Sequence, residues 1–541
     1  MKRIISLKHR YDYTPNNQIE SITRAFGTKD ARTITYTYTP SGKIATKTLP
    51  DTTTLIYQYH PLGYLCSLIS SDQKIHYNFK ANKNGQLLSA SNGEITIQRI
   101  LDPSGNVLKE TFPYFEIIKE YDQFDRCTQL TLGNQGQVLY TYDPLFLRSV
   151  KRISSNGSSY QHVYEEYDLA GNLLTESLIG NLGKVFHTTN LKGQKASIVS
   201  PYFSQKCTHD SAGNLINNTI DQEKNQYTYD NLSQLISEKN NTYSNDSLYN
   251  RTQQNNHTSQ LNNLNELLSL NNTLFSYDLN GNTITKQTHR FTYDPLNQLI
   301  ETKNIRFIYD PLGRRLSKIT GNSRENYIYD GQNEIGALSN NILKNLKILG
   351  HTTVAIELEN QPFAPLLDAQ GNICRLVNPR TKNIEESYEF TAFGKETKNY
   401  TNPWRFASKR FDPELNLIYF GKRYYDPEFG RWLTTDPAGF VDSTNLYQYV
   451  FNNPLRYQDH DGQFAFLLPL AIPLFNIALP TLAITLPTAT QLAVIAGTAV
   501  IATVGYKAIE SANRWDQKHI YGMDDQGELK LQLSITQTTE Y

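Results

Sequence analysis

Short runs of alternating polar and apolar residues fill most of the chain, and each run ends at a recurring motif. The motif is aromatic-Asp-x-x-Gly-x-hydrophobic, as in YDLAGNL from Tyr167 and YDPLGRR from Tyr309. Alternation with a period of two is typical of a β-strand with one buried face. Asp-x-x-Gly sequences favour tight turns, because glycine adopts a positive φ without strain. The pattern therefore predicts a repeated β-hairpin.

The motif returns, with variations, over most of the chain. Copies begin at Tyr11, Tyr38, Tyr59, Leu101, Tyr121, Tyr142, Tyr167, His209, Tyr229, Tyr277, Tyr293, Tyr309 and Tyr329. Hairpins of this size cannot bury an apolar face alone, so neighbouring hairpins must stack into a continuous, twisted sheet. We predict an all-β fold of hairpins coiled into a spiral β-shell or partial barrel, in which the Tyr residues pack strands and the Asp residues cap turns. In the Asn-rich segment 239–272 we predict worn copies of the same repeat.

The composition argues against several classes of function. The formal net charge is zero, charged residues make up 19% of the chain and no basic block occurs, so no nucleic-acid partner is expected. The four cysteines lie far apart without a CxxC pair, which indicates neither a zinc knuckle nor a dense disulfide framework. Neither HExxH nor a P-loop sequence occurs. We therefore expect no cofactor, no metal site and no small-molecule substrate.

A denser set of motifs follows the repeats. Residues 402–462 contain RFASKRFDPELNLIYFGKRYYDPEFGRWLTTDPAG and NLYQYVFNNPLRYQDHDG. This stretch resembles the RHS repeat-associated core domain, and the resemblance to the RHS/YD-repeat family extends over about residues 10–462. The family includes bacterial polymorphic-toxin carriers, the C components of insecticidal toxin complexes and the teneurin YD-shell. The resemblance implies a hollow β-shell and, in the bacterial toxin members, a core domain that cuts its own chain as an aspartyl protease just after a second DPxG-like motif.

Matching these motifs residue by residue gives Arg423, Asp436 and Asp459 as candidate catalytic residues for self-cleavage. Two carboxyl groups held close together do not both ionise easily, so one can act as an acid while the other activates water. A nearby arginine can stabilise the developing oxyanion. The alternative is that Asp436 and Asp459 only cap turns and that no cut occurs. The sequence keeps this alternative open, because DHDGQ at Asp459 replaces the usual motif with Pro second and Leu after the Gly.

The composition changes sharply after the core motifs. No charged residue occurs between Gly462 and Tyr506, and residues 488–505 form a proline-free, apolar run for which we predict a helix. The run is long enough to predict a marginal transmembrane helix. Three interpretations stay open: membrane insertion through residues 464–506, an apolar segment held inside the shell, and the remnant of an exchanged toxin module.

These boundaries predict four regions: repeats at 1–360, the core domain at 361–462, an apolar segment at 463–510 and a polar tail at 511–541. Three functions follow: a structural and delivery shell of the RHS polymorphic-toxin type, a self-cleaving aspartyl peptidase that releases its own C-terminus, or an adhesion protein anchored by the apolar segment. About fifteen repeat units are few for a closed cage, so we expect a larger repeat-bearing shell partner. Because the N-terminal stretch lacks the apolar centre of a Sec signal, we expect membrane association or secretion by a non-Sec route.

Overall fold

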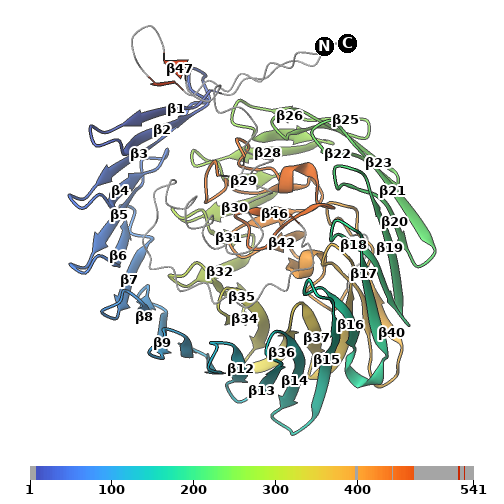
Figure 1. The fold of residues 1–541 in the computed structure, drawn as a ribbon. Helices are drawn as coiled ribbons and strands as arrows, with labels where there is room; N and C mark the ends of the chain where they lie inside the picture. Colours follow the sequence, from blue (N-terminus) through green and yellow to red (C-terminus); the bar gives the residue numbers. More distant parts are fainter. Residues whose placement is uncertain (1–7, 397–399, 442, 468–521, 524–528, 531–541) are drawn as a thin grey trace.

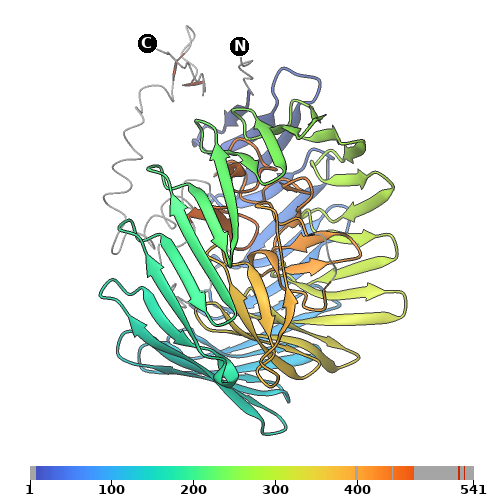
Figure 2. The ribbon, with the colours of Figure 1, turned by 90° about the vertical axis from the view of Figure 1, so that its right-hand side faces the viewer.

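Two long antiparallel meanders make up most of the fold. The computed structural model describes residues 8–396, 400–441, 443–467, 522–523 and 529–530. The first meander forms a 25-stranded sheet and the second a 15-stranded sheet, and within each sheet every strand pairs with the next one along the chain. Figure 1 shows the first meander curving around strands β42 and β46 near the centre, and Figure 2 shows both meanders as curved walls around the later strands. The predicted all-β shell of hairpins is therefore confirmed.

The strands of the first meander are Arg10–Tyr13 (β1), Ile19–Arg24 (β2), Arg32–Tyr38 (β3), Ile44–Thr48 (β4), Thr54–Tyr59 (β5), Leu65–Ser70 (β6), His76–Ala81 (β7), Leu87–Ser91 (β8), Thr96–Leu101 (β9), Val107–Phe112 (β10), Phe115–Tyr121 (β11), Cys127–Leu132 (β12), Gly136–Tyr142 (β13), Leu147–Ser154 (β14), Ser159–Tyr167 (β15), Leu173–Ser177 (β16), Lys184–Thr189 (β17), Lys195–Ser200 (β18), Phe203–His209 (β19), Leu215–Ile220 (β20), Glu223–Tyr229 (β21), Leu235–Glu238 (β22), Asn241–Asn245 (β23), Arg251–Gln254 (β24) and His257–Thr258 (β25).

The second meander comprises Gln260–Leu261 (β26), Leu267–Leu270 (β27), Thr273–Tyr277 (β28), Thr283–Lys286 (β29), His289–Tyr293 (β30), Leu299–Thr302 (β31), Ile305–Tyr309 (β32), Arg315–Thr320 (β33), Ser323–Asp330 (β34), Asn333–Ser339 (β35), Ile342–Leu349 (β36), Thr353–Leu358 (β37), Gln361–Leu367 (β38), Ile373–Val377 (β39) and Ile384–Ser387 (β40). Strands β23 to β27 lie within the Asn-rich segment 239–272 and continue the hairpin pattern. The prediction of worn repeats there is confirmed.

A smaller set of strands lies inside the meanders. Strands Arg410–Asp412 (β41), Leu417–Tyr419 (β42), Tyr424–Asp426 (β43) and Arg431–Trp432 (β44) form a four-stranded sheet, and Tyr457–Asp459 (β45) pairs with Ala465–Leu467 (β46). Apart from this inner set, Gly522–Met523 (β47) pairs with Leu529–Lys530 (β48) (Figure 1), and three 3-10 turns of the described residues lie at Ile179–Asn181, Phe406–Ser408 and Val450–Asn452. We call residues 402–462 the plug.

Each repeat uses its Tyr and its Asp for different local tasks. In the repeat at Tyr167, Asp168 accepts hydrogen bonds from the backbone N–H of Ala170 (2.9 Å) and Asn172 (2.8 Å), which closes the turn. The Tyr167 hydroxyl donates to the backbone oxygen of Leu147 in the preceding repeat (2.6 Å). The same bond joins Tyr142 to Cys127, Tyr229 to Leu215 and Tyr329 to Arg315. Strand packing and turn capping therefore account for the motif in these repeats.

The turns also hold the plug in register with the shell. Asparagines of the NLYQYVFNNP segment each reach a turn of a different repeat: the side-chain amide of Asn445 donates to Asn250 (2.8 Å), that of Asn452 to Gln234 (3.0 Å) and that of Asn453 to Asn214 (2.9 Å). Each of these three acceptor residues lies four positions after the Asp of its own repeat motif. The plug motif is therefore complementary to the repeat spacing.

A turn that contacts the plug should contribute more stability than one that does not. We expect Asp168→Ala to lower the free energy of unfolding by ~1–2 kcal/mol, because two backbone donors lose their partner. Asp246→Ala should cost about twice as much. Each Asp also accepts a hydrogen bond from a side-chain amide, that of Asn172 or Asn250, and of these two amides that of Asn250 contacts Asn445 of the plug. Guanidinium unfolding of the two variants measures the difference. Equal losses would show that the plug contact adds nothing to stability.

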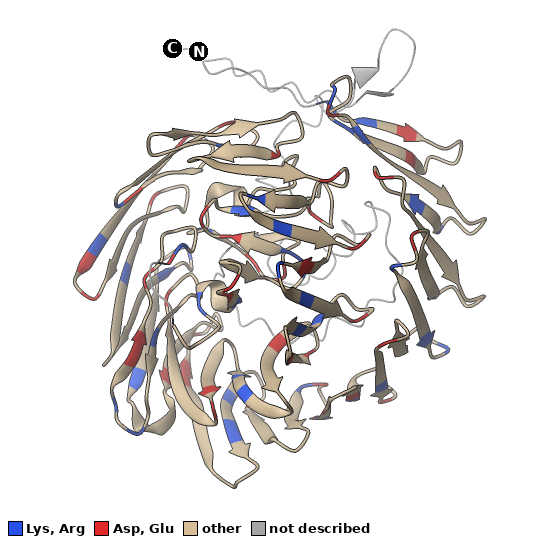
Figure 3. Ribbon diagram, turned by 180° about the vertical axis from the view of Figure 1, so that it is seen from behind, with Lys and Arg blue, Asp and Glu red and all other residues tan. Residues whose placement is uncertain are grey.

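Charged side chains contribute to the joint between the two meanders. Figure 3 shows acidic and basic residues interspersed along the strands. One buried pair joins Arg152 of β14 to Glu357 of β37 (3.1 Å), and the Tyr160 hydroxyl also donates to Glu357 (2.8 Å). A second buried pair joins Arg314 to Glu110 (3.0 Å). Each of these arginines faces a carboxylate across the interface between the two meanders. This pairing favours a single arrangement of the two sheets against each other.

The predicted transmembrane helix at 488–505, and the rest of the apolar segment beyond Leu467, lie outside the described residues. Within the described ranges, no helix is long and apolar enough to cross a membrane.

Candidate functional site

The three candidate residues come together at one end of the plug. Arg423 immediately precedes β43, Asp436 begins the turn after β44, and Asp459 ends β45. Arg423 and Asp459 are buried, and Asp436 is partly buried. Tertiary folding therefore gathers residues separated by up to 36 positions into one cluster.

The Arg423 guanidinium links both carboxyl groups. Its Nη2 lies 2.7 Å from Oδ2 of Asp436 and 3.5 Å from Oδ2 of Asp459. Because both acids lie against the same nitrogen, the two carboxyl groups are neighbours. This is the arrangement in which one acid can be neutral while the other is charged.

The same guanidinium also contacts the backbone of the second motif. Its Nε donates to the carbonyl oxygen of Gly462 at 2.5 Å. A charged donor on a carbonyl oxygen draws electron density from the carbonyl carbon and stabilises an oxyanion there. The peptide bond from Gly462 to Gln463 is therefore polarised by the residue that holds both candidate acids.

Asp459 organises the turn that carries this peptide bond. Its Oδ1 accepts hydrogen bonds from the backbone N–H of Asp461 (3.2 Å), Gly462 (2.7 Å) and Gln463 (3.2 Å). Gly462 has φ +84°, and a Cβ there would lie 3.1 Å from the Arg423 backbone nitrogen. Glycine is thus required both by the backbone angle and by the close approach of Arg423.

Burial changes the protonation of Asp459. Burial raises the pKa of Asp459 to about 6. The nearby charge of Asp461 raises this pKa further, whereas the Arg423 guanidinium lowers it. The carboxyl group is therefore protonated to a large extent in mildly acidic solution, where an ordinary aspartate is ionised. A protonated acid beside a charged one is what acid-base hydrolysis requires.

Sequence reasoning missed two parts of this cluster. Trp432 is buried, and the Arg423 guanidinium lies over its ring at 4.2 Å from the centroid. The second is the Gly462 carbonyl itself. The GRW sequence of the core motif was a signal for Trp432, but only the folded sheet shows that its ring lies under Arg423. His460, in the same turn, is exposed.

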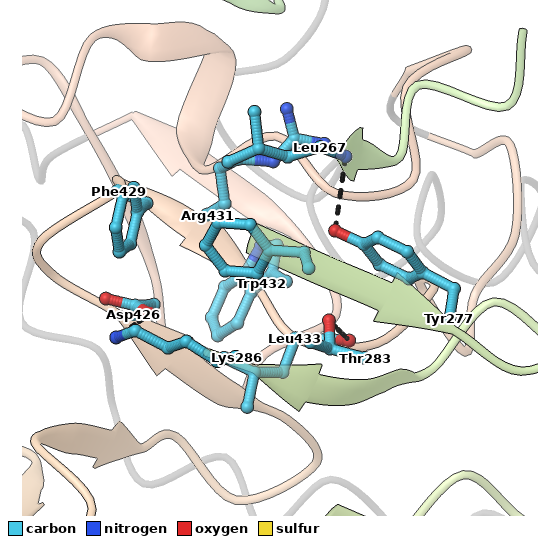
Figure 4. Close-up of a pocket in the computed structure, with 10 residues that line it drawn as sticks. Leu267, Tyr277, Thr283, Lys286, Asp426, Phe429, Arg431, Trp432 and Leu433 are labelled. Atoms are coloured by element: carbon cyan, nitrogen blue, oxygen red, sulfur yellow. Dashed lines mark hydrogen bonds and ion pairs between the residues drawn. The ribbon is translucent and has the colours of Figure 1, made fainter. Parts of the chain in front are cut away.

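A small pocket lies on the shell side of the plug. Figure 4 shows its lining, which comes from β27 to β29 of the shell and from β43 and β44 with their connecting turn. Lys286 pairs with Asp426 (2.6 Å) and the Thr283 hydroxyl donates to the backbone oxygen of Leu433 (2.8 Å). These polar groups are paired across the seam, so the pocket is part of the plug–shell joint. Among the described residues, no group of His, Cys, Asp and Glu is arranged to hold a metal ion.

Comparison with protein families and with individual proteins shows which known proteins this chain resembles. The family model for the teneurin YD-shell matches residues 194–456. Toxin subunit YenC2 of Yersinia entomophaga is 55% identical over 58 residues, which cover 11% of this chain and 6% of YenC2. The tRNA nuclease WapA of Bacillus subtilis is 29% identical over 171 residues, covering 28% of this chain and 7% of WapA. The chain thus spans less than a tenth of the length of these relatives.

Solved structures share the fold over most of the chain. The crystal structure of TcdB2-TccC3 superimposes with a TM-score of 0.72 at 17% identity, covering 84% of this chain and 29% of that one. TcdB2-TccC3-TEV gives 0.71 at 18%, with 84% and 28% covered. These likenesses show that the chain has the same shell fold. In its repeats, its plug motifs and these likenesses, the chain is similar to the RHS/YD-repeat family, and it resembles both toxin-complex C components and the teneurin YD-shell.

Proposed function

We propose that this chain is a structural and delivery shell of the RHS polymorphic-toxin type, and that its plug cuts the chain once to free its own C-terminal segment. The four regions predicted above divide this work: residues 1–360 form most of the wall, 361–462 are the core domain that completes the wall and contains the plug, and 463–510 and 511–541 are the segment that is enclosed or presented. The observation that carries the proposal is the contact of Arg423 with Asp436, Asp459 and the Gly462 carbonyl oxygen.

The chemistry follows from these contacts. Asp436, paired with Arg423, is the candidate base that takes a proton from water. The water oxygen attacks the Gly462 carbonyl carbon, and Arg423 stabilises the oxyanion that forms. Protonated Asp459, whose Oδ1 already contacts the Gln463 N–H, gives its proton to the departing nitrogen. The bond between Gly462 and Gln463 breaks, and each new end gains one part of the water molecule.

The intact mass of the freshly expressed chain under denaturing conditions tests this function. We expect two fragments whose boundary lies at or next to Gln463. A single full-length mass, stable over days at pH 5 to 7, would contradict self-cleavage and would leave the turn-capping role of Asp436 and Asp459.

We also propose that a larger repeat-bearing chain completes the shell. Turn tips of four successive repeats carry exposed apolar side chains: Phe124, Leu145, Leu169 and Leu191. At the turn tips of two later repeats, Leu296 and Leu312 pack against the buried cluster of β5 to β8. The exposed tips are therefore suited to pack against the sheet of another YD-repeat chain. Size-exclusion chromatography of the co-expressed chains would show one stoichiometric complex, and separate peaks would contradict it.

A further inference from the structure

The bond that the proposed function would cut lies in the turn of a β-hairpin. Strand β45 pairs with β46 in the register Tyr457 to Leu467, Gln458 to Phe466 and Asp459 to Ala465. The Gly462–Gln463 peptide lies between the two strands. A cut in the turn separates the covalent chain, but it leaves the backbone pairing of the two strands in place.

Both new chain ends would form next to a group of opposite charge. Hydrolysis adds water across the peptide bond, so that Gly462 ends in a carboxylate and Gln463 begins with an α-ammonium. The Gly462 oxygen already accepts a hydrogen bond from Arg423 (2.5 Å), and the Gln463 nitrogen already donates to Asp459 (3.2 Å). After the cut, each of these hydrogen bonds can join two opposite charges, which makes it shorter and stronger.

A second acidic side chain in the same turn adds to this site. Asp461 Oδ1 is buried and makes no hydrogen bond to a described residue, while the backbone oxygen of Asp461 accepts a hydrogen bond from the Lys422 N–H (2.8 Å). Asp459 is itself buried. Two acidic groups, one of them with an unused oxygen, favour a cation at this turn.

We propose that the plug is also a binding site for the strand it releases: an extended peptide with a free amino terminus, held by pairing with β45 and by an ion pair with Asp459. This inference rests on the proposed cut. Strand addition supplies the backbone hydrogen bonds, and capture of the amino terminus supplies selectivity for a cut end over an internal segment. The C-terminal segment therefore stays attached after cleavage until the strand is pulled away.

Two measurements on the full-length chain separate this inference from the cut itself. Denaturing mass spectrometry reports cleavage, and size-exclusion chromatography in native buffer reports retention. We expect two masses from a single native peak. Two masses from two native peaks would overturn the retention while leaving the cut intact.

Were the chain to stay whole, the proposed function would fail, and retention would be tested on a nicked variant. A protease recognition sequence inserted after Gly462, for a protease that cuts at the end of its own site, leaves Gln463 as the new amino terminus. We expect the nicked pieces to co-elute in native buffer. Their immediate separation would overturn the proposed binding site.

Proline substitutions test whether β46 is the attachment. Only alternate residues of a strand donate a backbone hydrogen bond to the partner strand. One of the two substitutions Ala465→Pro and Phe466→Pro therefore removes a hydrogen bond of the ladder, and that variant should release the segment about tenfold faster. Ala465→Ser keeps the N–H and is the matched control. Equal release from all three variants would show that the strand pairing does not hold the segment.

A synthetic peptide tests the amino-terminal contact. The pentapeptide Gln-Phe-Ala-Phe-Leu, which matches residues 463–467, should displace the retained segment from the cut protein. Its N-acetylated form lacks the ammonium and should need about tenfold more peptide for the same displacement. Equal potency of the two forms would contradict the ion pair with Asp459.

Discussion

Asp459→Asn should leave the chain whole, with self-cleavage slowed by about three orders of magnitude. Asparagine keeps the shape of the side chain and can still accept the turn hydrogen bonds through its oxygen, but it has no carboxyl proton to give to the departing nitrogen. Denaturing mass spectrometry over time measures the fraction cut. His460→Ala, an exposed change in the same turn, is the matched control and should cut at the unmodified rate.

The pH profile distinguishes acid catalysis from a loss of structure. Because burial raises the pKa of Asp459 to about 6, its proton is present below that pH and is lost above it. The cleavage rate of the unmodified chain should therefore fall as the pH rises through about 6. Groups close to Asp459 that also carry charge are Arg423, Asp436, Asp461 and Lys409. A rate that is the same from pH 5 to 8, or an Asp459→Asn chain that cuts normally, would assign Asp459 to turn capping alone.

Asp412→Ala should produce the largest loss of stability, ~3–5 kcal/mol, because it leaves a buried arginine without its counter-charge. Arg315 is fully buried and pairs with Asp412 and with the Tyr424 hydroxyl, while its guanidinium lies over the rings of Tyr327 and Tyr419. The contact joins the second meander to the plug.

A nearby surface pair provides the control for this experiment. Lys318 contacts both Asp412 (3.7 Å) and the more exposed Glu414 (3.2 Å). Glu414→Ala removes a solvent-screened charge and should cost at most about 0.5 kcal/mol. Guanidinium unfolding followed by fluorescence measures both variants. A similar small effect for Asp412→Ala would mean that water or another group replaces the lost carboxylate.

The local features of the repeat were predictable from sequence because they arise within a few residues. Asp168 caps a turn whose donors lie two and four residues away, and Gly171 takes the positive φ that the turn needs. Tyr167 and the alternating strand residues follow from the same short period. The candidate residues Arg423, Asp436 and Asp459 came from the core motif, which the resemblance assigned without any knowledge of their distances.

Only the tertiary structure decided how these units meet. Leu145 and Leu312 occupy the same position of two YDPL turns, yet Leu145 is exposed and Leu312 packs against the cluster of β5 to β8. Likewise, Trp432 under Arg423 and the Gly462 carbonyl at its Nε depend on how the four-stranded sheet and the β45–β46 hairpin pack. The sequence by itself determined the hairpin, its turn and the family of motifs, since neighbouring residues specify them. Burial and long-range pairing depend on which repeats the coiled sheet brings together, and no local pattern encodes that geometry.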